Sequence, residues 1–402
     1  MRSIPAWQGA CIGHNGRTMP SPIAPTREAG PTERLAQIQH ARRELLHQQR
    51  GAGSALLAPW IERSWQRCMG SGHQPGETVG FDLLSAGTMR RTREANYALT
   101  KAARPVLQEL GQALAATRYF AILTNAQGVV VDVNGPINRS DRRAHLISRI
   151  GVDLSERSIG TSAISAALAE LQPVWLHRGE HFFDDTSAYS CAGAPLFGAH
   201  GECVGMLDVT GVDVPERPEL KHLLTRYARS IENILVQEPA HQLLLRLSWP
   251  GQQPGADSDG LVTLDADGFV VGCNTTARQM IPPLALAQTH PGSRCHSHAL
   301  FAVAFEMLFD ATRRGAQPIA LPLWSGLQVQ AVALPSKGLH MAAARRPALG
   351  PVPVDTGVPR RLKDIETALI RKAVVDARGN VALAATRLGV SRATVYRKLG
   401  IK

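Results

Sequence analysis

Apolar residues recur every three or four positions along three stretches near the start of the chain. This spacing places them on one face of a helix and therefore predicts helices there. The predicted helices cover residues 32–49, 56–68 and 93–114, the last with an interruption or kink near Pro105. Residues 1–30 are rich in Gly, Pro, Ser and Thr and are expected to lack fixed structure. We therefore divide this part into an N-terminal segment, 1–54, disordered and then helical, and a helical region, 55–116.

From about residue 117 the hydrophobic pattern changes. Short runs rich in β-branched and aromatic residues predict strands, and the first two runs are joined by the turn 125–128. The predicted strands are 119–123, 129–133, 173–176, 194–197 and 203–209, and the predicted helices are 160–171 and 218–236. Strands mixed with helices on this scale indicate one α+β domain over residues 117–237.

A second, smaller α+β domain is expected after the Pro- and Gly-rich stretch 249–255, which we interpret as a linker. Runs at 261–264 and 269–273 flank a turn and predict a hairpin. A helix over 299–313 and strands at 318–323, 327–334 and 340–344 complete this domain, which we place at 255–345. The proline-rich residues 346–360 then predict a second linker.

Positive charge is concentrated at the C-terminal end. The 402 residues carry a formal net charge of +11, and residues 360–402 alone contain 11 Lys and Arg against 3 Asp and Glu. This excess favours a polyanionic partner. Because aromatic residues make up only 5% of the chain, rows of stacking platforms for single strands are not expected, and double-stranded DNA is the predicted partner.

The same segment, 361–402, has the pattern of an all-α unit of three short helices. Gly379 is placed to end the first helix, Asn380 to cap the second and Ser391 to cap the third, while Gly389 supplies the turn before the third. This is the helix-turn-helix layout, in which the last helix enters the major groove. The alternative is a helical hairpin with a solvated basic face. The residues predicted to contact DNA are Thr386, Ser391, Arg392, Ala393, Thr394, Tyr396, Arg397 and Lys398.

Among these residues, Arg392 can pair bidentately with guanine, whereas Arg397 and Lys398 are expected to hold phosphates. The run from Gly379 to Lys398 resembles in full the Fis-type helix-turn-helix at the end of bacterial enhancer-binding regulators. That resemblance implies a homodimer that binds an inverted repeat, with RNA polymerase as a further candidate partner.

Four stretches of the central domain resemble the GAF sensor domain of the acetoin catabolism regulator group, namely 151–163, 179–182, 190–195 and 201–208. Residues 61–68 also fit that group, and residues 260–274 resemble a PAS domain. The domain combines an apolar interior with a few polar groups, which suits a pocket for a small effector. The alternative is a domain that only dimerises. The predicted ligand-binding residues are Asp132, Glu156, Thr161, His181, Asp185, Tyr189, Cys191 and Asp208.

Two other chemistries can be drawn from the same residues. Cys191 with His181 suggests a nucleophile, although no third group is identifiable and a buried structural cysteine is the commoner case. The pair His177 and His181 with 184–185, and separately the run 295–298, suggest metal ligands, but neither spacing is a recognised metal pattern. We therefore expect no catalytic residue, metal or cofactor. The sequence contains neither a transmembrane run nor a signal peptide, so a cytoplasmic protein is expected.

Regulators with this type of C-terminal unit usually carry an AAA+ ATPase before it. A phosphate-binding loop needs a Gly-Lys pair, and this sequence contains none; it also lacks the Gly-Ala-Phe-Thr-Gly-Ala loop that engages sigma-54. The sequence therefore predicts a ligand-responsive transcriptional regulator of class α+β that binds specific DNA without ATP-driven activation. A GAF-containing signalling enzyme and a constitutive architectural DNA-binding protein are the alternatives.

Overall fold

A computed structural model describes residues 31–47, 57–286, 294–315 and 317–336, together with four single positions near the C-terminus. Two compact units are formed, residues 1–341 and residues 342–402. None of the helices within the described residues combines the length and apolar character that a membrane span needs. The strand expected at 340–344 lies outside the described residues, as do the segments 1–30 and 346–360.

Four helices precede the first sheet. They are α1 (Pro31–Arg42), which continues into a π-helical turn (Arg43–His47), α2 (Pro59–Gly70), α3 (Ala86–Ala95) and α4 (Tyr97–Ala113). The helix expected over 56–68 begins three residues later because Pro59 occupies its first turn, where a missing N–H costs no hydrogen bond. The interruption expected near Pro105 is wrong, whereas the alternative of a kink there stays a prediction. Helix α4 continues through Pro105, and the chain breaks instead at Asn96, between α3 and α4.

The first sheet is antiparallel and has the strand order β2-β1-β5-β4-β3. Its strands are β1 (Tyr119–Asn125), β2 (Val130–Asn134), β3 (Val174–His177), β4 (Tyr189–Phe197) and β5 (Cys203–Val212). Between β2 and β3 the chain forms α5 (Arg142–Ile147), α6 (Glu156–Ile159) and α7 (Ala163–Glu170), and α8 (Leu220–Gln237) follows β5. Five strands were expected in this sheet and five are present. Strand β4 begins at Tyr189 rather than at 194, because its first half contains a glycine and small residues that give no strand pattern in the sequence.

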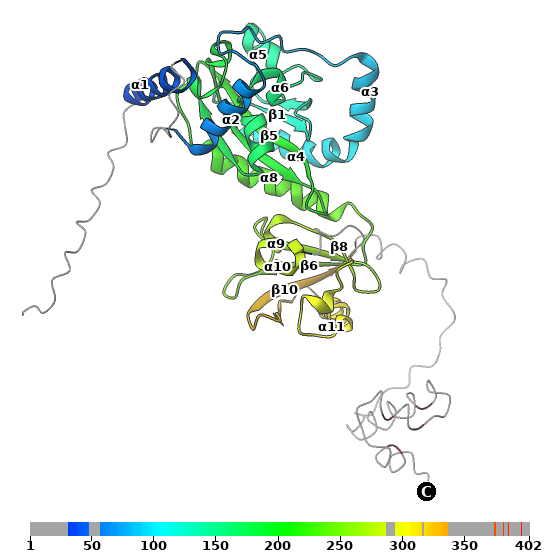
Figure 1. The fold of residues 1–402 in the computed structure, drawn as a ribbon. Helices are drawn as coiled ribbons and strands as arrows, with labels where there is room; N and C mark the ends of the chain where they lie inside the picture. Colours follow the sequence, from blue (N-terminus) through cyan, green and yellow to red (C-terminus); the bar gives the residue numbers. More distant parts are fainter. Residues whose placement is uncertain are drawn as a thin grey trace, which may run out of the picture. The chain divides into compact units, whose positions relative to one another are not determined.

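Alternating side chains of this sheet enter two different cores. On β1, for example, Phe120 and Ile122 join the core that contains residues of α2, α5 and α7. Tyr119, Ala121 and Leu123 point the other way, into the core formed with α4 and α8. Figure 1 shows the strands enclosed between these helices. The central strands are therefore buried on both faces, and a polar side chain on them has no access to water.

A second antiparallel sheet has the order β8-β7-β6-β10-β9. It contains β6 (Leu243–Ser248), β7 (Gly260–Leu264), β8 (Val270–Cys273), β9 (Ile319–Pro322) and β10 (Gln328–Pro335). One face is covered by α9 (Thr275–Met280), α10 (Pro282–Leu286) and α11 (Phe305–Ala311). The helix expected over 299–313 is instead two 3-10 turns flanking the shorter α11.

The prediction of a linker at 249–255 is wrong. Strand β6 lies before this stretch and pairs with both β7 and β10, at the centre of the second sheet. The stretch therefore connects two neighbouring strands inside one domain, and this domain begins near 243 rather than 255. A Pro- and Gly-rich loop between strands has the same composition as a linker, so composition alone could not separate the two.

Asn274 ties α8 to the second sheet. Its Nδ2 donates to Asn233 Oδ1 on α8 and to the carbonyl oxygen of Asp259, both at 2.8 Å. Its Oδ1 accepts from the backbone N–H groups of Leu261 and Ala277, and the bond from Ala277 makes Asn274 the N-cap of α9. All four hydrogen-bonding positions of a buried amide are thus used.

Candidate ligand pocket

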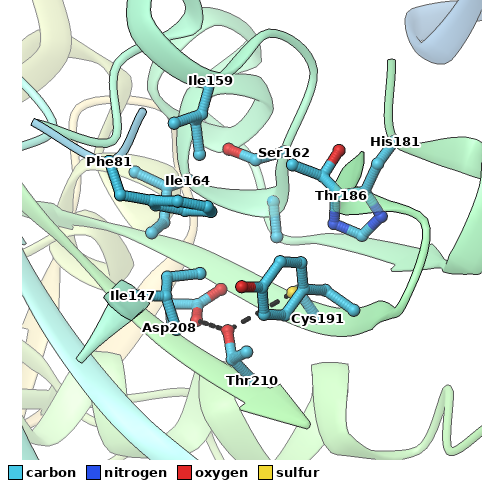
Figure 2. A pocket seen from close by; sticks show the side chains of 12 residues that line it. Phe81, Ile147, Ile159, Ser162, Ile164, His181, Thr186, Cys191, Asp208 and Thr210 are labelled. Atoms are coloured by element: carbon cyan, nitrogen blue, oxygen red, sulfur yellow. Dashed lines mark hydrogen bonds between the residues drawn. The ribbon is translucent and has the colours of Figure 1, made fainter. Parts of the chain in front are cut away.

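A small cavity lies beside the first sheet, on the face that carries α5 and α7 (Figure 2). Its volume is about 10 Å³, roughly what one water molecule requires. Its walls combine apolar side chains with several polar groups that are shielded from solvent. The lining residues are Phe81, Ile147, Ile159, Ser162, Ala163, Ile164, His181, Thr186, Tyr189, Cys191, Asp208 and Thr210.

The floor of the cavity is formed by β4 and β5. Cys191 on β4 lies opposite Thr210 on β5, and Asp208 is two residues before Thr210, so all three side chains share one face. Gly193 on β4 allows α7 to approach: a Cβ at this position would lie only 2.6 Å from the carbonyl oxygen of Ala163. The absence of a side chain at Gly193 therefore sets the distance between the floor and the start of α7.

The segment 177–186 forms another wall and carries His181 and Thr186. It consists of two 3-10 turns (Arg178–Glu180 and Asp184–Thr186). The Glu180 carboxylate accepts from the backbone N–H of His177 at 2.7 Å, and the indole N–H of Trp65 on α2 donates to the carbonyl oxygen of Glu180 at 3.0 Å. Burial raises the pKa of Glu180 to about 7, against the opposing charge of Arg34.

Asp208 is a buried carboxyl group with one unused oxygen. Burial raises its pKa to about 7, although the hydrogen bond that Thr210 donates to Oδ2 favours the ionised form. Its Oδ1 has no hydrogen-bond partner among the described residues. Near neutral pH the group can therefore accept a hydrogen bond as a carboxylate or donate one as an acid.

His181 presents a single acceptor atom to the cavity. Its Nδ1 lies 2.9 Å from the carbonyl oxygen of Arg178, which can only accept, so Nδ1 carries the proton. Burial lowers the pKa of His181 to about 4, so the ring is neutral at pH 7. Nε2 is then unprotonated, and it has no hydrogen-bond partner within the described part of the chain.

Cys191 has the opposite environment to a nucleophile. Burial, and next the nearby charge of Asp208, raise the pKa of its thiol well above the usual value. A hydrogen bond joins its sulfur to the hydroxyl of Thr210 at 3.3 Å, and among the described residues it has no hydrogen bond with His181. Because the thiolate is the reactive form, this environment does not support the nucleophile hypothesis. Tyr189, two residues before Cys191, donates a hydrogen bond from its hydroxyl to the carbonyl oxygen of Arg143.

The structure brings together four of the eight residues that the sequence predicts for ligand binding. His181, Tyr189, Cys191 and Asp208 line the cavity. The other four, Asp132, Glu156, Thr161 and Asp185, lie outside this lining, so the cavity gives them no contact with a ligand.

These four residues have structural partners instead. Glu156 pairs with Arg67 at 2.8 Å, and the Thr161 hydroxyl lies 2.7 Å from that of Ser64. The remaining two, Asp185 and Asp132, accept from the backbone N–H groups of Val79 and Val133, respectively.

Sequence reasoning missed the apolar wall and Thr210. Thr210 could have been inferred, because a strand places residue i+2 on the same face as Asp208. Phe81 carried no such signal: it comes from a loop before the domain and has a φ of 49°, an unusual conformation for a large side chain. Apolar residues such as Ile147 do not differ in sequence from ordinary core residues.

The proposed metal patterns do not assemble. No group of three or more His, Cys, Asp and Glu side chains suited to a metal ion is present among the residues described. His177 Nδ1 bonds to the hydroxyl of Ser190 at 2.8 Å, while His296 Nε2 lies 2.9 Å from the carbonyl oxygen of Asp267. Both rings therefore serve structural contacts.

All eight residues predicted to contact DNA lie outside the described residues. The four described positions of the C-terminal unit, Val374, Val381, Ala385 and Val395, are helical, and Ala385 and Val395 are buried against the other two. Val381 and Ala385 lie within the second predicted helix and Val395 within the third, so these apolar residues lie where short helices would pack together.

Two families match the chain. Residues 98–235 match the GAF domain, and residues 361–400 match "Bacterial regulatory protein, Fis family". The chain contains a GAF domain and a C-terminal Fis-type helix-turn-helix. The GAF match begins at 98 and so includes most of α4, whereas the sequence alone suggested a start at 117.

Several curated proteins are similar to this chain. The acetoin catabolism regulatory protein of Cupriavidus necator is 30% identical over 258 residues, which are 62% of this chain and 37% of that protein. The acetoin dehydrogenase operon transcriptional activator AcoR of Bacillus subtilis is 24% identical over 229 residues, 57% of this chain and 38% of AcoR. The chain thus spans less than two fifths of the length of these relatives. A solved structure of the E. coli DhaR(N)-DhaL complex aligns with 69% of this chain and 100% of its own, at 16% identity and a TM-score of 0.43.

Proposed function

We propose that this chain is a ligand-responsive bacterial transcriptional regulator that binds specific DNA through residues 361–402. The observation that carries the proposal is the presence of a GAF domain and a Fis-type helix-turn-helix in one chain. The concentration of basic residues in 360–402 supports DNA as the partner. The names of the relatives, which include a transcriptional-control protein and an operon activator, point to the same role.

The proposed regulator works without hydrolysing ATP. No Gly-Lys pair for a phosphate-binding loop occurs in the sequence, and only residues 336–360 separate the second sheet from the helix-turn-helix. Regulation would therefore come from occupancy of DNA by a homodimer on an inverted repeat, with RNA polymerase as a further candidate partner. The second sheet, which we assign to a PAS-like domain, would link the GAF domain to the DNA-binding unit.

The proposed sensor is the cavity beside β4 and β5. Its two unused polar atoms, His181 Nε2 and Asp208 Oδ1, are hydrogen-bonding positions that no other described residue occupies. Leaving such atoms buried and unpaired is costly, so a ligand that pairs with them gains affinity. His181 Nε2 accepts only, and this favours a small ligand that carries a hydroxyl or N–H donor.

The test is to map the genomic sites bound by the full chain and to measure its affinity for a duplex so recovered. Small metabolites chosen from the neighbouring genes are then added, and an effector is expected to change the DNA affinity by about 5-fold or more. Failure to enrich any site contradicts the proposal. Sequence-specific binding that no metabolite alters, even when the cavity is filled, would instead favour the architectural DNA-binding protein.

A further inference from the structure

The cavity is too small for an effector as it stands. Its volume of about 10 Å³ suits one water molecule, so a ligand of several non-hydrogen atoms requires one wall to move. The floor is formed by β4 and β5, which are paired along their whole lengths and lie inside the sheet. The segment 177–186 is a different kind of wall, because it consists of short turns held from outside by another part of the chain.

Arg42, at the end of α1, holds that segment. Its Nη1 donates to the carbonyl oxygen of Gly179 at 2.9 Å and to that of His181, and its Nη2 donates to the carbonyl oxygen of Phe182 at 3.0 Å. The guanidinium also pairs with the Asp184 carboxylate at 2.5 Å. Only 7% of Arg42 is exposed, so these contacts form in a place from which water is largely excluded.

The contact between α1 and this segment is close-packed. A Cβ on Gly179 would lie 3.0 Å from Cδ of Arg42 and 3.2 Å from Cγ2 of Ile38. Ile38 and Ala41 of α1 are fully buried in the same core that contains Phe182 and Cys191. Helix α1 therefore covers the outside of the wall whose inside carries His181.

We propose that Arg42 is a positioning residue for ligand recognition and that α1, which precedes the GAF match, is the latch that closes the cavity. Arg42 fixes the backbone on both sides of His181 and so directs Nε2 into the cavity. Release of these contacts lets residues 178–184, the part of the segment 177–186 that Arg42 holds, move outward, and the opened cavity admits a ligand. A ligand that binds the open wall better than the closed wall then shifts α1 toward release. That this opening serves an effector rests on the proposed function, but the latch itself does not.

Cys191 provides a readout that needs neither an effector nor DNA. The full chain is treated with N-ethylmaleimide under native conditions, and the labelling rate of each cysteine is followed by mass spectrometry of its peptides. Cys191 is buried in the cavity and Cys273 is buried in the second sheet. Cys68 on α2 is buried in the core of the same domain as Cys191 but outside the cavity. Labelling of Cys191 alone thus reports opening of the cavity, whereas labelling of Cys68 or Cys273 reports unfolding of the first or the second domain.

The variant Arg42→Gln is expected to label at Cys191 about tenfold faster or more, because it loses several hydrogen bonds from a charged group. Cys273 is expected to keep its wild-type rate. Arg63→Gln is the matched control: Arg63 pairs with Glu170 on the protein surface and does not touch the segment 178–184. This control should leave both rates unchanged.

Asp184→Asn is the second variant, because its side chain is 60% exposed and its replacement should not prevent folding. It should raise the Cys191 rate selectively but less than Arg42→Gln. Unchanged Cys191 labelling in both variants, or equal acceleration of Cys191 and Cys68, would overturn the latch. If DNA binding fails while labelling follows the prediction, the proposed function is wrong and the latch stands.

Discussion

His181 and Asp208 reach the same cavity from different elements, and each leaves one polar atom without a hydrogen-bond partner among the described residues. His181 comes from the 3-10 segment that Arg42 holds, whereas Asp208 lies on a central strand. The first group stays neutral because burial lowers its pKa to about 4, and the second titrates near pH 7 because burial raises its pKa. A fixed acceptor therefore faces a carboxyl group that can change its charge.

The substitution Asp208→Asn should remove part of the pH dependence of stability. The carboxyl pKa is about 7 in the folded protein and about 3.9 in an unfolded chain, so the folded state binds the proton more tightly. The free energy of unfolding therefore falls as the pH rises from about 4 to about 7, by up to about 4 kcal/mol. Thermal unfolding should show the variant more stable than wild type at pH 8.

At pH 3 Asp208 is protonated in both the folded and the unfolded protein, so the two proteins should differ there by no more than about 0.5 kcal/mol. Glu180, whose pKa burial also raises to about 7, keeps part of the slope in both proteins. The difference between the two curves isolates Asp208. The advantage of the variant over wild type, in free energy of unfolding, should be larger at pH 8 than at pH 5. A smaller advantage at pH 8 would show that the fold stabilises the carboxylate.

Gly193→Ala should displace α7 from the sheet. Its Cβ would lie 2.6 Å from the carbonyl oxygen of Ala163, a backbone atom that cannot rotate away. We expect a loss of roughly 1–3 kcal/mol in the free energy of unfolding, measured by urea denaturation. Gly76→Ala is the control, because nothing lies within 4 Å of the added Cβ there. Equal effects of the two changes would argue against close packing of α7.

Asn274→Ala should loosen the connection between α8 and the second sheet. It removes both donors and the acceptor that serves two buried backbone N–H groups, at a cost of about 1–3 kcal/mol or more. Hydrogen exchange should accelerate at the amides of Leu261 and Ala277. Gln279→Ala on the exposed side of α9 should not change these rates. Unaltered exchange in the Asn274 variant would mean that other contacts hold this junction.

Two substitutions in the C-terminal unit should separate base recognition from phosphate contact. Arg392→Ala should cost about 1–3 kcal/mol at its own base position and relax specificity there. Arg397→Ala should weaken binding to all sequences alike and reduce the salt slope by about one. Fluorescence anisotropy with the recovered duplex and a scrambled duplex compares them. Equal losses on both duplexes for Arg392→Ala contradict its assignment to a base.

Much of the first domain follows from hydrophobic periodicity. The hairpin of β1 and β2 and the long helix α8 lie within a few residues of the predicted spans, because their patterns are long and regular. The second sheet was harder to delimit. Strand β6 is a short leucine-rich run that follows α8 after residues 238–242, and its hydrophobic pattern alone does not distinguish a buried strand from a buried helix.

Part of the polar lining of the pocket was predicted, whereas the apolar lining and the hydroxyl groups of Ser162, Thr186 and Thr210 were not. His181 and Asp208 attract attention because ionisable side chains are rarely buried without a role or a partner. Glu156 and Asp185 are acidic residues like Asp208, but their carboxylates are bound by Arg67 on α2 and by the backbone N–H of Val79, respectively. The role of Arg42 lies in contacts with backbone atoms more than 130 positions away, and no local pattern marks it.

DNA binding by the C-terminal unit is the central claim, and one titration tests it most directly. The full chain and a chain ending at residue 359 are each titrated against a genomic duplex recovered with the full chain, at low and at physiological salt. The account predicts saturable binding by the full chain, with affinity that falls steeply as salt rises, and no binding by the shortened chain. Equal affinity of the two proteins for that duplex would contradict it.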